Sequence, residues 1–176
     1  MPAMSTEDFW TSIESFGYQY QYMFNSLQIN NGNFTFSNVA NLTGIHQTDW
    51  SWATLFVDFD NDGDKDNFIS NGYRKYNSDN DFNNRYQATS KKYNNNIPLK
   101  EWQDLYADMP EQKLSNLLYR NDGDLHFEEK GKDWGLAKPS YSNGAAFGDL
   151  DNDGDLDLIV NNIDDKAFVY LSLIHI

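Results

Sequence analysis

The chain contains an internal repeat: two segments match at a constant offset of 91 residues, without a gap from Asn25 to Asn71. A repeat on this scale is typical of propellers and solenoids, in which each unit buries its apolar face against the next. Two units cannot close a ring, so the repeat predicts part of a longer propeller. The matched pairs include Asn25 and Asn116, Leu27 and Leu118, Asn30 and Asn121, Gly32 and Gly123, Phe36 and Phe127, Gly44 and Gly135, Ser51 and Ser142, and Phe56 and Phe147.

Each repeat contains the nine-residue pattern D-x-D-x-D-G-D-x-D, at residues 58–66 and 149–157. Five carboxylates this close repel one another unless something neutralises them, and oxygen ligands at alternate positions suit Ca²⁺. Positions 1, 3 and 5 can converge on one ion, the glycine at position 6 allows a sharp turn, position 7 offers its carbonyl and position 9 closes the shell. The predicted calcium residues are Asp58, Asp60, Asp62, Asp64 and Asp66 in the first loop, and Asp149, Asp151, Asp153, Asp155 and Asp157 in the second.

These loops are not EF-hands, although they begin like them. An EF-hand needs a bidentate glutamate at position 12 and a helix after it. Position 12 is Ile69 in the first loop and Val160 in the second, each within a short apolar run of strand type. Apolar runs at 53–57 and 145–148 precede the loops. The predicted unit is therefore strand, calcium loop, strand.

On these residues the chain resembles bacterial FG-GAP/VCBS-repeat proteins, which are related to the integrin α-subunit propeller. It is most similar to the group that carries ASPIC/UnbV domains and includes cartilage acidic protein. The resemblance covers most of residues 18–170. It rests on Leu27-Gln-Ile-Asn-Asn-Gly-Asn-Phe-Thr-Phe36, Trp50-Ser-Trp-Ala53, 58–66, Asn71-Gly-Tyr73, Lys113-Leu-Ser-Asn116, Arg120-Asn-Asp-Gly123 and Ser142-Asn-Gly-Ala-Ala-Phe-Gly148 running into 149–162.

The resemblance implies an all-β fold, a partial β-propeller of FG-GAP/VCBS repeats with short helical insertions. It implies two Ca²⁺ sites, with positions 1, 3, 5 and 9 of each loop as side-chain ligands and Asp64 and Asp155 as main-chain ligands. One departure is Val57 before the first loop, where the second repeat has Gly148. This departure affects packing at the loop entrance rather than the ligands.

The predicted organisation has five parts. Residues 1–24 form a helix and a strand leading into the first repeat, which spans 25–73. Residues 74–112 are an Asn-rich insertion with a short helix, 113–170 are the second repeat, and 171–176 are a tail that is possibly non-native.

Two helices are expected outside the repeats. Residues 5–16 read as a helix with Ser5 as N-cap and Gly17 as its stop, followed by strand alternation from Tyr18 to Phe24. In the insertion, apolar side chains from Leu99 to Met109 fall at helical spacing after Pro98.

The charge of the chain excludes several partners. The net charge is −14, to which the first loop contributes −4 and the second −5. With no cluster of Lys or Arg, binding to nucleic acid or to an anionic membrane is not expected.

The sequence has no cysteine, no apolar run long enough to span a membrane and no signal peptide at 1–4. Sites of this type usually bind calcium weakly, so they stay filled only where calcium is plentiful. This favours an extracellular or cell-surface location.

No carboxylate outside the loops belongs to a recognisable catalytic constellation, so the chain is not expected to be an enzyme. The favoured function is a calcium-binding propeller module with structural ions that binds a protein or glycan at a surface, beside the remaining blades of its parent. The alternatives are a polysaccharide-active propeller enzyme, a lyase or hydrolase, and a structural spacer in a large surface protein.

Overall fold

The computed structural model describes residues 6–17, 24–76 and 79–172. Its helices are α1 (Thr6–Phe16), α2 (Ala40–Thr43), α3 (Asn80–Lys92) and α4 (Leu99–Ala107). Its strands are β1 (Gln28–Asn30), β2 (Phe36–Asn38), β3 (Ser51–Val57), β4 (Asp66–Asn71), β5 (Leu117–Asn121), β6 (Phe127–Glu129), β7 (Ser142–Gly148), β8 (Asp157–Asn162) and β9 (Phe168–Tyr170).

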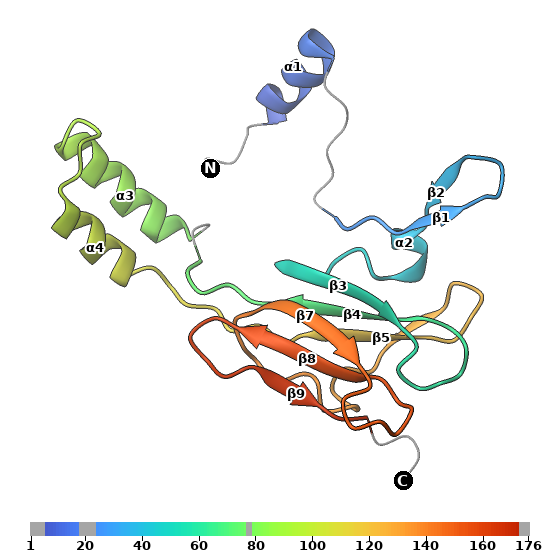
Figure 1. Cartoon of the computed structure of the whole chain (residues 1–176). Helices are drawn as coiled ribbons and strands as arrows, with labels where there is room; N and C mark the ends of the chain where they lie inside the picture. The colour runs from blue at the N-terminus through green and yellow to red at the C-terminus, as the bar shows by residue number, and fades with distance from the viewer. Residues whose placement is uncertain (1–5, 18–23, 77–78, 173–176) are drawn as a thin grey trace.

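The strands form three antiparallel sheets (Figure 1). The first sheet is the pair β1-β2, the second has the order β3-β4-β5-β6, and the third has the order β7-β8-β9. No closed barrel forms among the described strands. The fold is therefore mainly β with helical insertions, which confirms the predicted all-β, partial propeller class.

Each acidic loop joins two paired strands, as the sequence predicts. The β3-β4 pairing ends at Val57 and Asp66, and the β7-β8 pairing ends at Gly148 and Asp157. Both hairpins also carry a register shift at their other end, after Ser51 and after Ser142. The two copies of the sequence repeat thus fold in the same way, including this irregularity.

One sequence repeat contributes strands to two sheets. The first repeat forms β1, β2, β3 and β4, and the second forms β5, β6, β7 and β8 at equivalent positions. The four-stranded sheet therefore combines the end of the first repeat with the start of the second. Each repeat crosses from one sheet to the next, which links neighbouring sheets through the chain itself.

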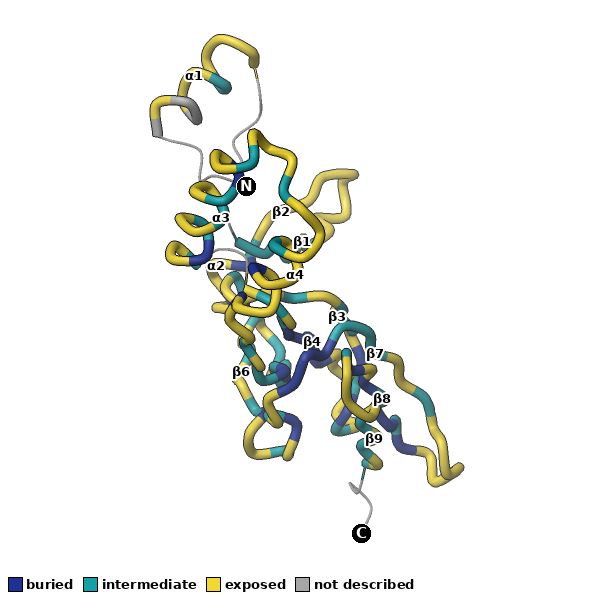
Figure 2. Tube along the Cα trace, turned by 90° about the vertical axis from the view of Figure 1, so that its left-hand side faces the viewer, coloured by how far each residue is buried: buried dark blue, intermediate teal, exposed yellow. Residues whose placement is uncertain are grey.

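The main core lies between the second and third sheets. It consists of Val57, Phe59, Phe68, Leu118, Leu136, Leu158 and Val160. Every residue of β4 is buried, and burial is concentrated in β4 and β8 (Figure 2). A strand that is buried on both faces reads as a continuous apolar and small polar run rather than as an alternation. The two sheets therefore stack against each other, as neighbouring propeller units must.

Gly72, directly after β4, lies against the backbone at the start of β7. A Cβ at this position would lie 2.6 Å from the Tyr141 Cα and would also strike the backbone of Ser142. Because both obstacles are backbone atoms, a side chain at Gly72 requires β4 and β7 to move apart. Gly72→Ala is therefore expected to lower the free energy of unfolding by about 1–3 kcal/mol, measured by urea denaturation.

Gly148 provides the matched control for this substitution. It lies at the end of β7, has no positive φ, and a Cβ there would meet nothing within 4 Å. Gly148→Ala should be neutral or slightly stabilising, because alanine restricts the unfolded chain. Equal losses in the two variants would show that β4 and β7 do not touch at Gly72.

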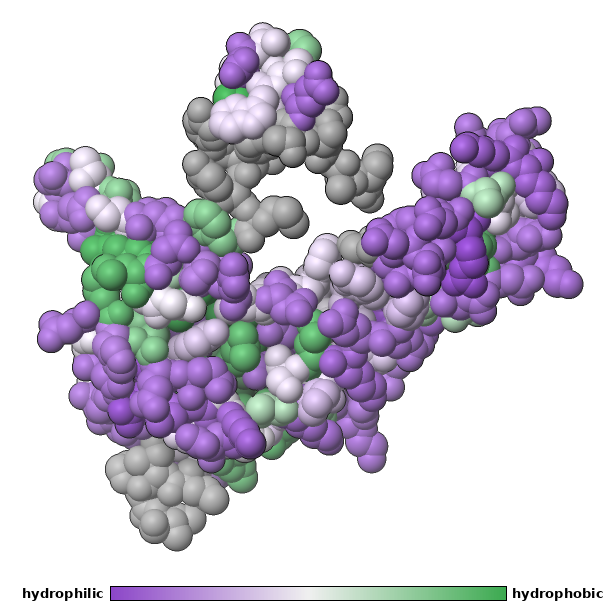
Figure 3. Space-filling view, turned by 180° about the vertical axis from the view of Figure 1, so that it is seen from behind, coloured by the Kyte–Doolittle hydropathy of each residue, from purple (hydrophilic) through white to green (hydrophobic). Residues whose placement is uncertain are grey.

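The insertion between β4 and β5 forms an arm of two helices, α3 and α4, that projects from the sheets (Figure 1). Phe82, Leu105 and Met109 form a small core of their own, against which Tyr86 packs. Lys75 anchors the base of the arm, since its Nζ donates to the carbonyls of Ala107 and Met109. From behind, the arm is largely hydrophilic (Figure 3).

The predicted helix in this arm is confirmed as α4, with Pro98 at its N-cap position. The sequence reading did not include α3, which has Asp79 as its N-cap; the Asp79 carboxylate accepts the Phe82 N–H at 2.7 Å.

At the N-terminus, α1 is also confirmed, and Gly17 follows it with a φ of 67°. The predicted Ser5 cap and residues 18–23 of the predicted strand lie outside the described residues. Among the helices that the structure describes, none has the length and apolar character that crossing a bilayer would take.

Candidate metal centres

The two acidic loops have the same backbone conformation. Asn61 and Asn152, at position 4, have φ values of 56° and 61°. Gly63 and Gly154, at position 6, have φ values of 98° and 97°. Asparagine tolerates the left-handed region better than most residues, and glycine adopts it freely. The Asn and Gly at these positions therefore explain why both loops make the same tight turn.

The aspartate at position 1 holds each turn together. Asp58 accepts the backbone N–H groups of Asp62 at 3.2 Å and Gly63 at 3.0 Å. Asp149 makes the equivalent bonds in the second loop, at 3.1 and 3.2 Å. Each carboxylate oxygen keeps a second lone pair after accepting one hydrogen bond. Position 1 can therefore shape the loop and still offer oxygen to a cation.

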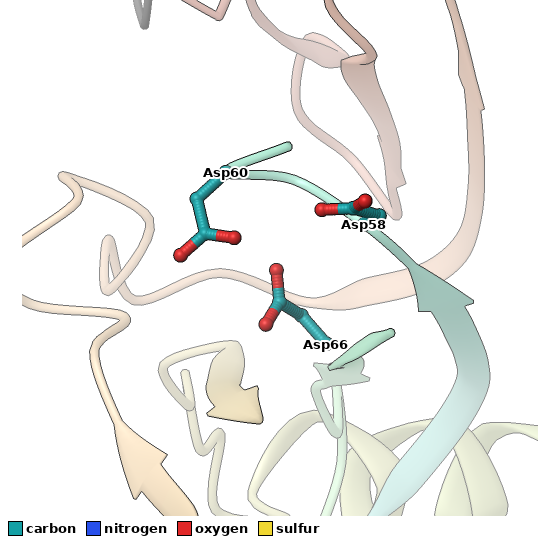
Figure 4. Close-up of side chains that lie close together, drawn as sticks. All are labelled: Asp58, Asp60 and Asp66. Carbon is teal, nitrogen blue, oxygen red and sulfur yellow. The ribbon is translucent and has the colours of Figure 1, made fainter. Parts of the chain in front are cut away.

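Each loop gathers three carboxylates into a cluster. In the first loop, Asp58, Asp60 and Asp66 have oxygens within 4.8 Å of one another, and their carboxylates point toward a common centre (Figure 4). In the second loop, the cluster consists of Asp149, Asp151 and Asp153. Two oxygens on opposite sides of one Ca²⁺ are about 4.6–5.2 Å apart. Both clusters are therefore compact enough for a single calcium ion.

The clusters share positions 1 and 3 and differ in their third member. The first cluster adds position 9, whereas the second adds position 5. In the first loop, the position 5 residue Asp62 lies outside the cluster, and its carboxylate accepts the Asp64 N–H at 2.9 Å. The structure thus brings together three of the four predicted side-chain ligands in each loop, and all four positions occur between the two.

The position 7 residues, predicted as main-chain ligands, have different surroundings. Asp64 is exposed, whereas Asp155 is fully buried, with none of its surface accessible to solvent. The Asp155 carboxylate accepts a hydrogen bond from Asn61 in the first loop.

A comparison with protein families matches residues 102–160 to an FG-GAP-like repeat. The chain contains an FG-GAP-like repeat. The match runs from α4 through β5, β6, β7 and the second acidic loop into β8. The first acidic loop lies outside the match and is related to it by the internal repeat. No curated protein matches the chain.

The aspartate at position 9 joins each loop to a neighbouring segment of the chain through backbone hydrogen bonds. Asp66 is fully buried, and its carboxylate accepts the N–H groups of Phe59 and Asn121, both at 3.0 Å. Asp157 is equally enclosed and accepts the N–H groups of Leu150 and Ser172, both at 2.8 Å. Position 9 therefore joins the loop to β5 in one sheet and to the residues after β9 in the other.

Burial raises the pKa of the Asp66 carboxyl to about 6, although the N–H groups of Asn121 and Phe59 oppose the rise. The charges of Asp60 and Asp62 raise it further. The loop therefore places a buried carboxylate among other carboxylates, an arrangement that a cation would relieve.

The Asp60 side chain has a carboxylate oxygen that no described group satisfies. Its Oδ1 atom is buried and has no hydrogen-bond partner within the described part of the chain. The pKa of Asp60 is raised, first by burial and then by the negative charge of Asp62, with Asp58 adding to it. The pKa of Asp151 is raised in the same way, by burial and by Asp153 and Asp157. The donor set and this orphaned oxygen fit a bound Ca²⁺ ion.

Sequence reasoning did not identify Asn61 and Asn121 as supports of the loops. The Asn121 backbone N–H donates to the Asp66 carboxylate, and the Asn121 side chain donates to the Lys65 carbonyl at 3.2 Å. Both residues recur in the other repeat at the 91-residue offset, Asn61 as Asn152 and Asn121 as Asn30. The recurrence was the available signal, but the contacts join segments that are far apart in sequence.

Proposed function

We propose that the chain is a calcium-binding propeller module in which each acidic loop holds one Ca²⁺ ion. The observation that carries this proposal is the repeated carboxylate cluster, with a buried Asp60 oxygen that lacks a hydrogen-bond partner in the described residues. A buried charged oxygen without a partner is costly, and a cation removes that cost.

The proposed ligands follow the repeat. In the first loop, Asp58, Asp60, Asp62 and Asp66 would contribute carboxylates and Asp64 its carbonyl. In the second loop, Asp149, Asp151, Asp153 and Asp157 would contribute carboxylates and Asp155 its carbonyl. A bound Ca²⁺ would supply positive charge that neutralises the loop and stiffens it. The proposed role of the ions is therefore structural, since a site saturated with protein oxygens offers no open position for a substrate.

The wider part of this proposal is a module that binds a protein or glycan outside the cell or at its surface. Two features support it: the FG-GAP-like repeat, and loops of a kind that typically binds calcium with Kd of roughly 10⁻⁴–10⁻³ M and so needs a calcium-rich environment. The closer relationship to ASPIC/UnbV proteins belongs to the same proposal. Calcium-dependent capture on glycan and protein arrays, compared with EDTA, tests the ligand class.

Thermal unfolding tests the calcium sites directly. With Kd in that range, 2 mM Ca²⁺ at two sites should stabilise the native state by about 1–4 kcal/mol. For a chain of this size, the midpoint should rise by roughly 3–10 °C relative to EDTA. The double substitution Asp60→Ala/Asp151→Ala should abolish this rise, because it removes position 3 from both clusters.

A control variant removes two carboxylates elsewhere. Asp104 in α4 and Asp133 after β6 are exposed and lie outside both loops. Asp104→Ala/Asp133→Ala changes the net charge by the same amount and should keep the full calcium response. If the native protein shows no calcium-dependent shift, or if both double variants lose it equally, the loops are not calcium sites.

A further inference from the structure

The two acidic loops are joined to each other by a hydrogen bond between sheets. The Asn61 side chain, at position 4 of the first loop, donates from Nδ2 to Oδ1 of Asp155, at position 7 of the second loop, over 2.7 Å. The two residues are 94 positions apart in the sequence. The bond spans the interface between the second and third sheets, so it connects two sites that the sequence presents as separate.

Both ends of this bond adjoin cluster residues. Asn61 lies between Asp60, a member of the first cluster, and Asp62. On the other side, the Asp155 backbone N–H donates to Oδ1 of Asp153, a member of the second cluster, at 3.0 Å. A continuous path therefore runs from Asp60 through Asn61 and Asp155 to Asp153.

Burial makes this bond consequential for the second loop. None of the Asp155 surface is exposed, and a buried carboxylate is destabilising unless donors meet it. A hydrogen bond to a charged group is worth more than one between neutral groups. The Asn61 amide therefore helps to fix the position of Asp155, the residue proposed to offer its main-chain carbonyl to the second ion.

Within the described chain, this bond has no counterpart between the equivalent residues of the other repeat. Asn152, the equivalent of Asn61, has the same left-handed backbone, but its side chain makes no hydrogen bond to a described residue. Asp64, the equivalent of Asp155, is exposed. The first loop thus supports the second, while nothing equivalent in these residues supports the first.

We propose that Asn61 is a positioning residue that couples the two cation sites. Calcium in the first loop fixes the turn from Asp60 to Asp62, holds the Asn61 amide against Asp155 and so pre-orders the second loop. This inference rests on the proposed calcium function. Coupling energies between sites are typically equivalent to fivefold or larger changes in affinity, and we expect about fivefold here.

Calcium titration of the full chain by isothermal calorimetry tests this coupling. Asp60→Ala disables the first loop, so the single remaining ion reports the second loop alone. The native protein should bind its second-loop ion about fivefold more tightly than Asp60→Ala does. Asn61→Gly should bind two ions but lose this advantage, while in the Asp60→Ala background it should have little further effect.

Asn152→Gly is the matched control. Glycine accepts a φ near 60°, so both variants relieve the same backbone requirement, but only Asn61→Gly loses a side-chain hydrogen bond between the loops. Asn152→Gly should keep the native affinities. If Asn61→Gly also binds two ions with native affinities, the coupling is overturned while the calcium function stands. If the native chain binds no calcium, both are overturned.

Discussion

Asp66→Ala is expected to lower the free energy of unfolding by about 2–4 kcal/mol, even in EDTA. The native carboxylate accepts two backbone N–H groups, from Phe59 at the loop and from Asn121 at the end of β5. Alanine leaves both donors without this acceptor in a site that excludes solvent, and it also opens a small cavity. Each bond to a charged acceptor contributes about 1.5–3 kcal/mol. Alanine also removes the burial and the repulsion by Asp60 and Asp62 that raise the pKa of Asp66, and this relief offsets part of the loss.

The size of this effect distinguishes a structural role from a role in metal binding alone. If Asp66 served only the ion, Asp66→Ala would match native stability in EDTA and differ only in calcium. Asp62→Ala is the comparison, because Asp62 is exposed and its carboxylate accepts one N–H within its own loop. We expect a much smaller loss for Asp62→Ala in urea denaturation without calcium. Similar values for the two variants would contradict the assigned role of Asp66.

Local patterns explain why the hairpins were predictable. An apolar run, a stretch of alternating Asp with Asn and Gly, and a second apolar run define strand, turn and strand within about twenty residues. The Gly at position 6 and the Asp at position 1 fix the turn through contacts inside the loop, such as Asp58 with Gly63. The ligand positions follow from the same short range, which is why both clusters contain predicted residues.

Long-range contacts explain what the sequence did not reveal. β5 pairs with β4 although the whole helical arm lies between them in the chain. Position 9 was predicted as a ligand, yet its partners include Asn121, which is 55 residues from Asp66. The bond between Asn61 and Asp155 joins loops that belong to two different sheets. Contacts between residues so far apart in the chain leave no periodic pattern in the sequence.

The helix α3 was missed for a different reason. Its sequence, NDFNNRYQATSKK, is rich in asparagine and other residues with modest helix propensity. Its stability comes from packing, since Phe82 and Tyr86 on α3 meet Leu105 and Trp102 on α4. A helix that depends on a partner for its stability is not evident from composition, because tertiary contacts override propensity. The Asp79 cap was the remaining local sign.

Phe68→Ala is expected to destabilise the chain by about 3–5 kcal/mol, because it empties a large volume at the centre of the main core. Phe68 has no exposed surface and lies in the cluster that contains Leu118 of its own sheet and Leu158 and Val160 of the next. It is also two residues after Asp66, so the cavity would open directly behind the first loop. Differential scanning calorimetry should show a lower midpoint.

Phe36→Ala is the matched control, because Phe36 lies outside this core. Phe36 in β2 is 63% exposed, and Phe36→Ala should change the free energy of unfolding by no more than about 0.5 kcal/mol. If the two sheets form one cooperative core, Phe68→Ala should lower a single unfolding transition rather than split it. A loss as small as that of Phe36→Ala would mean that the two sheets do not share a core. The hydrogen bond between Asn61 and Asp155 would then join two loops that no common core holds in place.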